Sequence, residues 1–174
     1  MSITVIDTKL PEVKIIKPEV YQDKRGFFYE SYNHQSFIKS VDCDVTFVQD
    51  NHSKSLINVL RGLHFQLPPF EQGKLIRVID GQVLDVAVDI RLESPTFGHW
   101  VAEILSSDNK KQLWIPQGFA HGFLTLSNEA EFLYKTTNFY SKTHERIIPY
   151  NDNSFKIEWP KIKNIILSSK DNSK

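Results

Sequence analysis

The chain has 174 residues, a length that predicts one domain, spanning residues 1–174, with its own buried core. Hydrophobic residues make up 40% and aromatic residues 12% of it, which excludes a disordered or collagen-like chain. Because 21 Lys and Arg balance 21 Asp and Glu, no basic excess favours binding to nucleic acid or to an anionic membrane.

Residues 1–7 lack the basic and apolar regions of a secretory signal, and no apolar run approaches the roughly 18 residues of a membrane span. Cys43 is the only cysteine, so an internal disulfide and a multi-cysteine metal site are both excluded. These features predict a cytoplasmic protein.

The first regular element expected is a helix over residues 33–41, which Asn33 can cap before the apolar Phe37. Short apolar-rich runs separated by turn residues follow it and are typical of strands. We expect these strands at residues 45–50, 59–66, 75–79, 82–90, 100–105, 113–115, 119–126 and 131–137. A second helical stretch is expected near the C-terminus.

Asp80-Gly81 predicts a tight hairpin between the runs 75–79 and 82–90, since both residues tolerate a positive φ. Along 82–90, apolar residues alternate with a face that carries Asp85 and Asp89, and such a face can line a polar cavity. Many short strands with few helices indicate an all-β sandwich, jelly roll or barrel.

Arg61 and His64 lie three residues apart in one expected strand. Regular alternation would send their side chains to opposite faces, unless Gly62 introduces a bulge. On these residues alone, a structural imidazole and an arginine at the rim are the default interpretation.

The stretch Pro116-Gln117-Gly118-Phe119-Ala120-His121-Gly122 resembles the second sequence motif of the cupin superfamily. That resemblance implies a cupin-like jelly roll, or double-stranded β-helix, with a few short helices. The first motif of metal-binding cupins supplies a His-x-His pair, but here it reads His64-Phe65-Gln66. Because one imidazole ligand is missing, the sequence argues against a metal centre.

Further motifs are distributed over nearly the whole chain. They are Gly26-Phe27-Phe28-Tyr29-Glu30, Phe47-Val48-Gln49-Asp50-Asn51, Val59-Leu60-Arg61-Gly62-Leu63-His64, Gln72-Gly73-Lys74, Asp85-Val86-Ala87-Val88-Asp89-Ile90-Arg91, Ser94-Pro95-Thr96-Phe97-Gly98, Trp114-Ile115-Pro116, Gly118-Phe119-Ala120-His121-Gly122-Phe123, Tyr134-Lys135 and Asn151-Asp152. In this order they resemble the dTDP-4-dehydrorhamnose 3,5-epimerases. Asn58 and Phe65 depart from the Gly and Tyr that are common in that family, but Asn tolerates the positive φ of a Gly turn.

The resemblance implies epimerisation at C3 and C5 of dTDP-4-dehydro-6-deoxy-D-glucose to dTDP-4-dehydro-L-rhamnose, in dTDP-L-rhamnose biosynthesis. Both hydrogens are acidic because they lie α to the C4 carbonyl. The reaction needs a base, an acid on the opposite face of the sugar and a positive group beside the enolate oxygen. It needs no cofactor.

The resemblance also implies roles for four residues: His64 is the base, Tyr134 the acid, Lys74 the enolate-stabilising cation, and Asp171 the carboxylate that orients His64. Without the family resemblance, Tyr134 could equally be a core residue. Lys74 would be read as a surface lysine, and Asp171 as an acid in a solvated tail.

The matching positions for substrate binding are Arg25, Glu30, Gln49, Asp50, Asn51, Arg61, Lys74, His121, Glu145 and Lys170. Arg and Lys suit a diphosphate, while amides suit sugar hydroxyls and a base edge. An aromatic ring is expected to stack on the thymine, but the sequence does not select it. The family further implies a homodimer in which strands pair across subunits.

Three alternatives remain at this stage. The first is a related nucleotide-4-keto-sugar enzyme, either a 3- or 5-epimerase or a 3,4-ketoisomerase. The others are a non-catalytic module that binds a sugar nucleotide and a metal-dependent cupin oxygenase. The presence of both His64 and Tyr134 favours epimerisation, and the missing His-x-His pair argues against the oxygenase.

Overall fold

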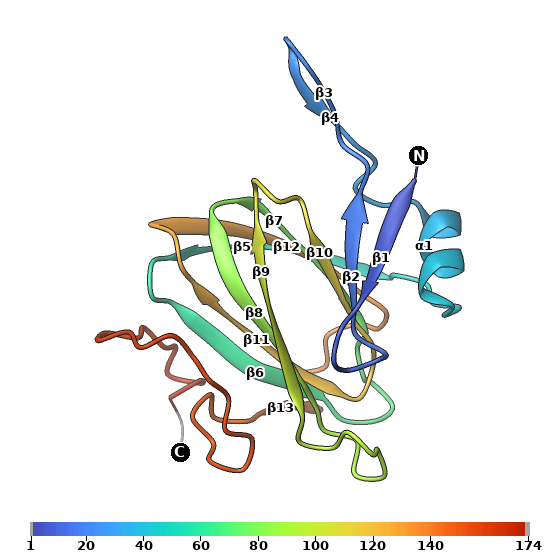
Figure 1. Cartoon of the computed structure of the whole chain (residues 1–174). Coiled ribbons are helices and arrows are strands. Elements are labelled where there is room, and N and C mark those ends of the chain that lie inside the picture. The colour runs from blue at the N-terminus through green and yellow to red at the C-terminus, as the bar shows by residue number, and fades with distance from the viewer. Residues whose placement is uncertain (1, 173–174) are drawn as a thin grey trace.

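The computed structural model describes residues 2–172, and two antiparallel sheets pack face to face in it as a jelly roll (Figure 1). The six-stranded sheet contains, in spatial order, β1 (Ile3–Asp7), β2 (Lys14–Pro18), β10 (Gln112–Ile115), β7 (Lys74–Asp80), β12 (Glu129–Thr136) and β5 (Gln49–Leu56). The five-stranded sheet contains β13 (Glu145–Ile147), β6 (Leu60–Gln66), β11 (Phe119–Thr125), β8 (Gln82–Asp89) and β9 (Trp100–Ser106). The expected all-β jelly roll is confirmed.

The main core lies between the two sheets at one end of the sandwich. Alternate residues of facing strands fill it, because side chains of a strand point to opposite faces in turn. Its members include Leu10, Val13, Ile76, Val78, Val83, Ala87, Leu105, Leu113, Phe123 and Phe132. Phe123 and Phe132 stack across the two sheets with ring centroids 4.2 Å apart. This packing fixes the distance between the sheets beside the cavity described below.

The helix α1 (His34–Val41) confirms the predicted helix and its cap. Asn33 Oδ1 accepts a hydrogen bond from the Ser36 backbone N–H at 3.1 Å, which satisfies a donor that the first helical turn leaves unpaired. Phe37 is buried and meets Trp114 edge-to-face at 5.3 Å. The helix thereby covers part of the outer face of the six-stranded sheet (Figure 1).

The predicted hairpin at Asp80-Gly81 is wrong. Its two strands, β7 and β8, lie in different sheets, where β7 pairs with β10 and β12 and β8 pairs with β9 and β11. Asp80-Gly81 is instead a corner that carries the chain from one sheet to the other. Gly81 has φ +75°, and a Cβ there would lie 2.0 Å from the carbonyl oxygen of Glu129. Turn residues fix the local bend but leave the pairing partner open.

The strand expected at 45–50 is displaced, since β5 covers Gln49–Leu56. The apolar residues before it, Val45 and Phe47, pack beside α1 and Trp114 instead of pairing in a sheet. The strands β1, β2 and β13 were not expected. The expected C-terminal helix is also wrong, because residues 169–172 form turns. Asn58 has φ +66°, as its turn position requires.

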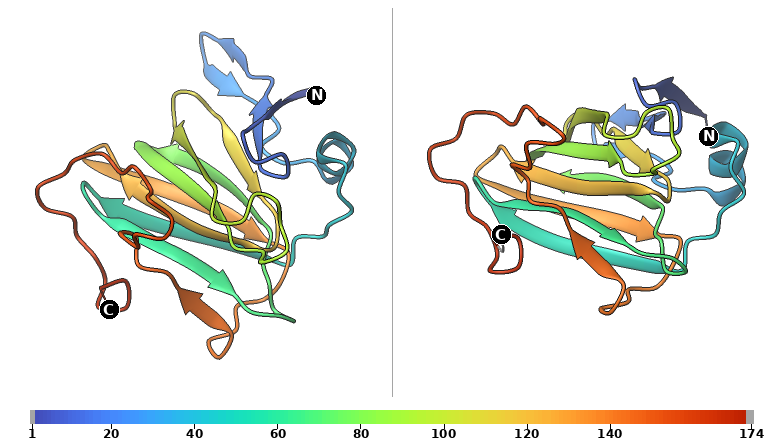
Figure 2. Two further views of the ribbon diagram at one scale, coloured as in Figure 1. Left: turned by 60° about the horizontal axis from the view of Figure 1, so that its bottom comes forward. Right: turned by 90° about the horizontal axis from the view of Figure 1, so that it is seen from below.

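Two segments lie outside the sandwich. The strands β3 (Tyr21–Asp23) and β4 (Gly26–Phe28) form a two-stranded arm that projects away from both sheets (Figures 1 and 2). After β13 the chain crosses the outer face of the five-stranded sheet, where Phe155 and Trp159 pack against a buried cluster that includes Val86 and Val88. No helix within residues 2–172 is long and apolar enough to span a membrane.

Candidate active site

A cavity of about 450 Å³ opens between the two sheets beside the main core. Its lining residues are Asp50, Asn51, His52, Ser53, Arg61, His64, Lys74, His121, Phe123, Phe132 and Tyr134. Arg61, His64 and His121 come from β6 and β11 of the five-stranded sheet, whereas Lys74 and Tyr134 come from β7 and β12 of the six-stranded sheet. His64 and Tyr134 therefore lie on opposite walls.

Arg61 and His64 reach the same cavity because β6 is bulged. His64 pairs with His121 and Arg61 with Phe123, so three steps along β6 match two along β11. Gly62 has φ +121°, and a Cβ there would lie 2.5 Å from the Gly122 Cα. Only glycine fits this backbone and this close approach. The bulge considered from the sequence is confirmed.

His64 is held from behind by the C-terminal segment. Its Nε2 lies 2.5 Å from Asp171 Oδ1, and the Asp171 side chain is only 3% exposed. Ser168 Oγ donates to Asp171 Oδ2 at 2.7 Å. When the carboxylate accepts from Nε2–H, the second ring nitrogen, Nδ1, is the basic atom. No hydrogen bond to this nitrogen is found within residues 2–172.

The electrostatics of His64 suit a base. Burial lowers the pKa of its imidazole, the hydrogen bond and charge of Asp171 raise it, and the charge of Lys74 lowers it further; the net shift is downward. The ring is therefore neutral near pH 7 and can accept a proton.

Lys74 is a buried cation beside His64. Lys74 is 7% exposed, and its Nζ donates to the His64 backbone carbonyl at 3.4 Å. Burial lowers the pKa of the Lys74 ammonium to about 8, although the charges of Asp85 and Glu145 act against this change. At neutral pH most of the ammonium is charged, and it can stabilise a negative oxygen in the cavity.

The pKa of Tyr134 shifts in the opposite direction to that of His64. Burial raises the pKa of its phenol, the charge of Glu145 adds to this effect, and the charge of Arg61 opposes it. The phenol therefore remains protonated and can donate a proton. Arg61 is oriented by hydrogen bonds from Nε to Ser55 Oγ at 3.0 Å and from one terminal nitrogen to the Lys54 carbonyl at 3.2 Å.

The expected binding residues on β5 have distinct environments. Asn51 Oδ1 accepts from Gln49 Nε2 at 2.8 Å, while its buried Nδ2 has no hydrogen-bond partner within residues 2–172. A buried donor without a partner is costly unless a ligand completes it. Asp50 lies at the edge of the cavity, and its carboxylate pairs with Lys135 Nζ at 2.9 Å.

Gln49, Glu145 and Lys170 lie away from the cavity lining and gather around Tyr140. The Tyr140 backbone N–H donates to Gln49 Oε1 at 3.0 Å, and its hydroxyl donates to Glu145 Oε2 at 2.9 Å. Lys170 forms an ion pair with the same carboxylate. Tyr140 is 52% exposed and was not selected from the sequence, because nothing in its sequence context separates it from the other aromatic residues.

Arg25 and Glu30 are not part of this cavity either. Arg25 lies at the tip of the arm with its side chain 85% exposed and paired with Asp23. Glu30 follows the arm, and its Oε1 accepts from Asn33 Nδ2 at 3.4 Å. Within a single chain, these two expected binding residues are not brought to His64.

Gln66 occupies the position where metal-binding cupins carry their second histidine of the pair. Its Nε2 donates to the carbonyl oxygens of Phe70 and Phe139, and its Oε1 accepts from the Ser141 backbone N–H at 2.6 Å. The amide thus anchors two loops. Within residues 2–172, no three His, Cys, Asp or Glu side chains are grouped so that they could share a metal ion.

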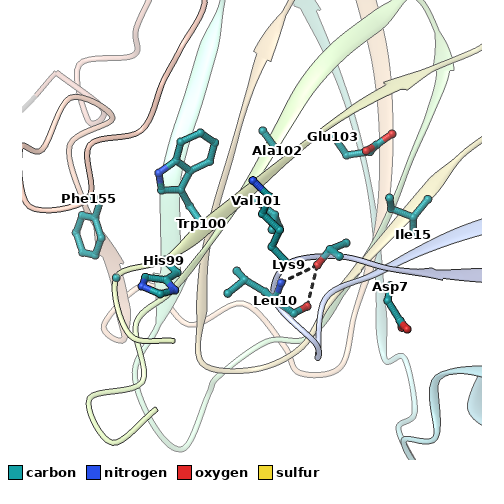
Figure 3. Close-up of a pocket in the computed structure, with 12 residues that line it drawn as sticks. Asp7, Lys9, Leu10, Ile15, His99, Trp100, Val101, Ala102, Glu103 and Phe155 are labelled. Carbon is teal, nitrogen blue, oxygen red and sulfur yellow. Dashed lines mark hydrogen bonds between the residues drawn. The ribbon is translucent and has the colours of Figure 1, made fainter. Parts of the chain in front are cut away.

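A second cavity, of about 810 Å³, lies between β9 and the turn that joins β1 to β2 (Figure 3). Its lining includes Leu10, His99, Trp100 and Phe155, and none of the expected site residues. It offers no buried base opposite an acid. We therefore assign the candidate active site to the smaller cavity.

Comparison with known proteins agrees with this geometry. The family model described as dTDP-4-dehydrorhamnose 3,5-epimerase matches residues 7–174. The chain belongs to this family. It is 60% identical over 167 residues to the dTDP-4-dehydrorhamnose 3,5-epimerases of Shigella flexneri and Salmonella typhimurium, covering 96% of this chain and 92% and 91% of theirs.

A solved structure extends the similarity to the fold. The RmlC epimerase of Legionella pneumophila, in complex with dTDP-4-keto-L-rhamnose, matches with a TM-score of 0.95 and 51% identity. The match covers 97% of this chain and 89% of that chain. The jelly roll is therefore the cupin-like fold of this epimerase family.

Proposed function

We propose that the protein inverts C3 and C5 of dTDP-4-dehydro-6-deoxy-D-glucose and so forms dTDP-4-dehydro-L-rhamnose for dTDP-L-rhamnose biosynthesis. The observation that carries this proposal is the placement of His64 and Tyr134 on opposite walls of one cavity, with Lys74 beside them. Inversion requires that a proton leaves one face of the sugar and returns to the other. A base and an acid on the same wall would only exchange the proton.

In the proposed mechanism, Nδ1 of His64 removes the proton on C5, and the electron pair of that C–H bond moves into the C4 carbonyl to form an enolate. Lys74 stabilises the enolate oxygen through its charge. Tyr134 then donates its phenolic proton to the opposite face of C5. Solvent returns the proton from His64 to Tyr134, and the cycle repeats at C3. Both steps are proton transfers, so no cofactor takes part.

We assign the nucleotide to the rim around Tyr140. The Tyr140 ring is exposed, and both its backbone and its hydroxyl are held in place, so it suits stacking on the thymine. Lys170 supplies a cation for the diphosphate. Asn51 Nδ2, which is buried without a partner within residues 2–172, is placed to donate to an oxygen of the substrate.

We further propose that the protein is a homodimer and that the arm binds the partner subunit. Phe27 and Phe28 are 56% and 61% exposed, and large exposed apolar side chains on a two-stranded arm favour association. In such a dimer, Arg25 and Glu30 contribute to the partner's cavity. Light scattering during size-exclusion chromatography measures the mass directly, and a monomer at micromolar concentration contradicts the proposal.

The protein is proposed to act in the cytoplasm. The single Cys43 cannot form a disulfide within the chain, which suits a reducing compartment. Activity in the soluble fraction of lysed cells, separated from membranes and periplasm, tests this location.

Proton NMR in heavy water with dTDP-4-dehydro-6-deoxy-D-glucose tests the function. We expect deuterium at both C3 and C5 and formation of the L-configured product, unchanged after dialysis against a chelator. Deuterium at one carbon only supports a single-carbon epimerase or a ketoisomerase. Binding of the nucleotide without exchange supports a non-catalytic module.

A further inference from the structure

A second buried carboxylate lies behind the cavity. Asp85 is on β8 and is fully buried, with 0% exposure. It is on the same face of the strand as Val83 and Ala87, which belong to the main core. Asp85 itself does not line the cavity. A charged group in such an apolar position is costly unless it is paired.

The hydrogen-bond partner of Asp85 is His121. Both carboxylate oxygens lie 3.0 Å from His121 Nε2, and within residues 2–172 no other hydrogen bond to Asp85 is found. His121 is 7% exposed, lines the cavity and stacks on Phe132 with centroids 6.1 Å apart. The carboxylate and Phe132 together fix the plane and the direction of the imidazole.

Asp85 also acts on Lys74. The charge of Asp85 is the first contribution that opposes the effect of burial on the Lys74 pKa. Burial raises the pKa of the Asp85 carboxyl, and the charge and hydrogen bond of His121, together with the charge of Lys74, oppose this rise. The other carboxylates at or near the cavity already have partners, and Asp50 is bound by Lys135. Asp171 is bound by His64 and Ser168, and Glu145 is bound by Lys170 and Tyr140.

We propose that Asp85 is a positioning residue, which orients His121 toward the sugar and keeps Lys74 in its charged form beside the enolate oxygen. This inference rests on the proposed function. The proposed role explains why a carboxylate occupies a core position of β8. An apolar residue there would remove the negative charge that favours the Lys74 ammonium, and it would leave His121 without an acceptor.

The pH dependence of Lys74 depends on every charged or titratable group around it. These groups are Asp50 and His52 on β5, Arg61 and His64 on β6, Asp85 on β8, His121 on β11, Tyr134 on β12, Glu145 on β13 and Asp171 in the C-terminal segment. Removing the charge of Asp85 leaves Glu145 as the remaining carboxylate that raises the Lys74 pKa, and Glu145 is itself paired with Lys170.

Asp85→Asn tests the proposal, because asparagine keeps the shape and can still accept from His121 Nε2–H. Without the negative charge, the pKa of Lys74 falls below about 8. We expect the alkaline limb of kcat/KM to move to lower pH by about one unit, which lowers the charged fraction of Lys74 at pH 8, and with it kcat, about fivefold. KM changes less than kcat, because the enolate forms only after binding. Asp85→Glu, which restores the charge, recovers part of the loss.

Asp89→Asn is the matched control. Asp89 is on the same strand and the same face as Asp85 and is also 0% exposed, but its carboxylate binds Arg91, Ser94 and Thr96. We expect Asp89→Asn to lower stability and leave the pH profile of the folded enzyme unchanged. Coincident pH profiles for Asp85→Asn and the wild type overturn the proposal.

A measurement without turnover separates this inference from the proposed function. The ¹³Cε resonance of Lys74, identified by its loss in Lys74→Met, is followed with pH by NMR. We expect a midpoint near 8 in the wild type and a lower one in Asp85→Asn. An unchanged midpoint contradicts the role of Asp85 even if the enzyme is active. A shifted midpoint in a protein without epimerase activity supports the electrostatic role of Asp85 and rejects the proposed reaction.

Discussion

In the proposed mechanism, burial is the largest influence that prepares His64 as a base and Tyr134 as an acid. Burial disfavours the charged form of each group, so it lowers the pKa of the imidazole and raises that of the phenol. The imidazole is then a neutral acceptor and the phenol a neutral donor. Apolar neighbours such as Phe132, which meets Tyr134 at 5.9 Å, contribute to this division of roles.

Substituting Tyr134 and substituting His64 are expected to change deuterium incorporation in different ways. In Tyr134→Phe, His64 still removes a proton and can return deuterium to the same face, so we expect exchange in heavy water without the L-configured product. In His64→Asn, exchange and product formation both fall by about 10²-fold or more. Proton NMR distinguishes the two. Full epimerase activity in both variants contradicts the proposed mechanism.

Ser168 is expected to act through Asp171. In Ser168→Ala, Asp171 Oδ2 loses its donor at 2.7 Å, and the carboxylate is less firmly held against His64. Because Asp171 raises the His64 pKa, weakening this contact lowers it further. The acid limb of kcat/KM then moves to lower pH, while the plateau falls about tenfold because a weaker base removes the proton.

The control for this prediction is Ser168→Thr, which retains a hydroxyl and is expected to recover most of the rate. A loss of activity in Ser168→Ala with no movement of the acid limb would assign Ser168 a purely structural role in the turn that contains Asp171.

At the scale of elements, the bulge in β6 decides the composition of the site. It brings Arg61 and His64 to one cavity, although they are three residues apart. Gly62→Ala places a Cβ 2.5 Å from Gly122 Cα and 2.7 Å from the His121 carbonyl oxygen. We expect a loss of about 2–4 kcal/mol in the free energy of unfolding.

Urea denaturation measures the loss in Gly62→Ala, and Gly26→Ala is the control. Gly26 also has a positive φ, of +126°, but no atom lies within 4 Å of a Cβ placed there. The difference between the two variants therefore reports the steric contact. Equal losses would show that backbone conformation alone accounts for the effect.

Much of the sheet structure could be predicted because apolar alternation and turn residues are local signals. The strands β6 to β12 lie close to their expected positions. Partner choice is not local: Asp80-Gly81 has the residues of a hairpin, yet its strands enter different sheets. The strand β5, QDNHSKSL, has almost no apolar residue, because it is an edge strand whose inward side chains line a polar cavity.

The candidate site shows the same contrast between residues that local sequence signals reveal and residues that only the folded structure reveals. His64 and His121 could be selected from short motifs, and the family resemblance supplied Lys74, Tyr134 and Asp171. Asp85, Ser168 and Tyr140 were not selected, since their proposed roles depend on contacts between segments distant in the chain. These contacts join Asp85 to His121, Tyr140 to Gln49, and Ser168 to His64 through Asp171. Alternation alone only suggested that the face carrying Asp85 could line a cavity, whereas this carboxylate lies behind one.

At the scale of the whole molecule, the arm separates two expected binding residues from the cavity. Arg25 is on a projecting two-stranded element (Figure 1), while His64 lies between the sheets. If the arm acts on the partner, each active site combines His64 of one subunit with Arg25 of the partner subunit. This arrangement predicts complementation between two defective chains.

Arg25→Ala and His64→Asn chains are each expected to be weakly active as homodimers. After mixed refolding, a heterodimer contains one site with an intact His64 and an intact arm from its partner, and one site with both defects. We therefore expect the mixed sample to recover activity, up to half the wild-type rate per heterodimer. If Arg25 acted on its own subunit, every site would carry one defect and mixing would restore nothing. Light scattering of the same sample checks that dimers have formed, so absence of recovery in a dimeric mixture rejects the exchange of arms.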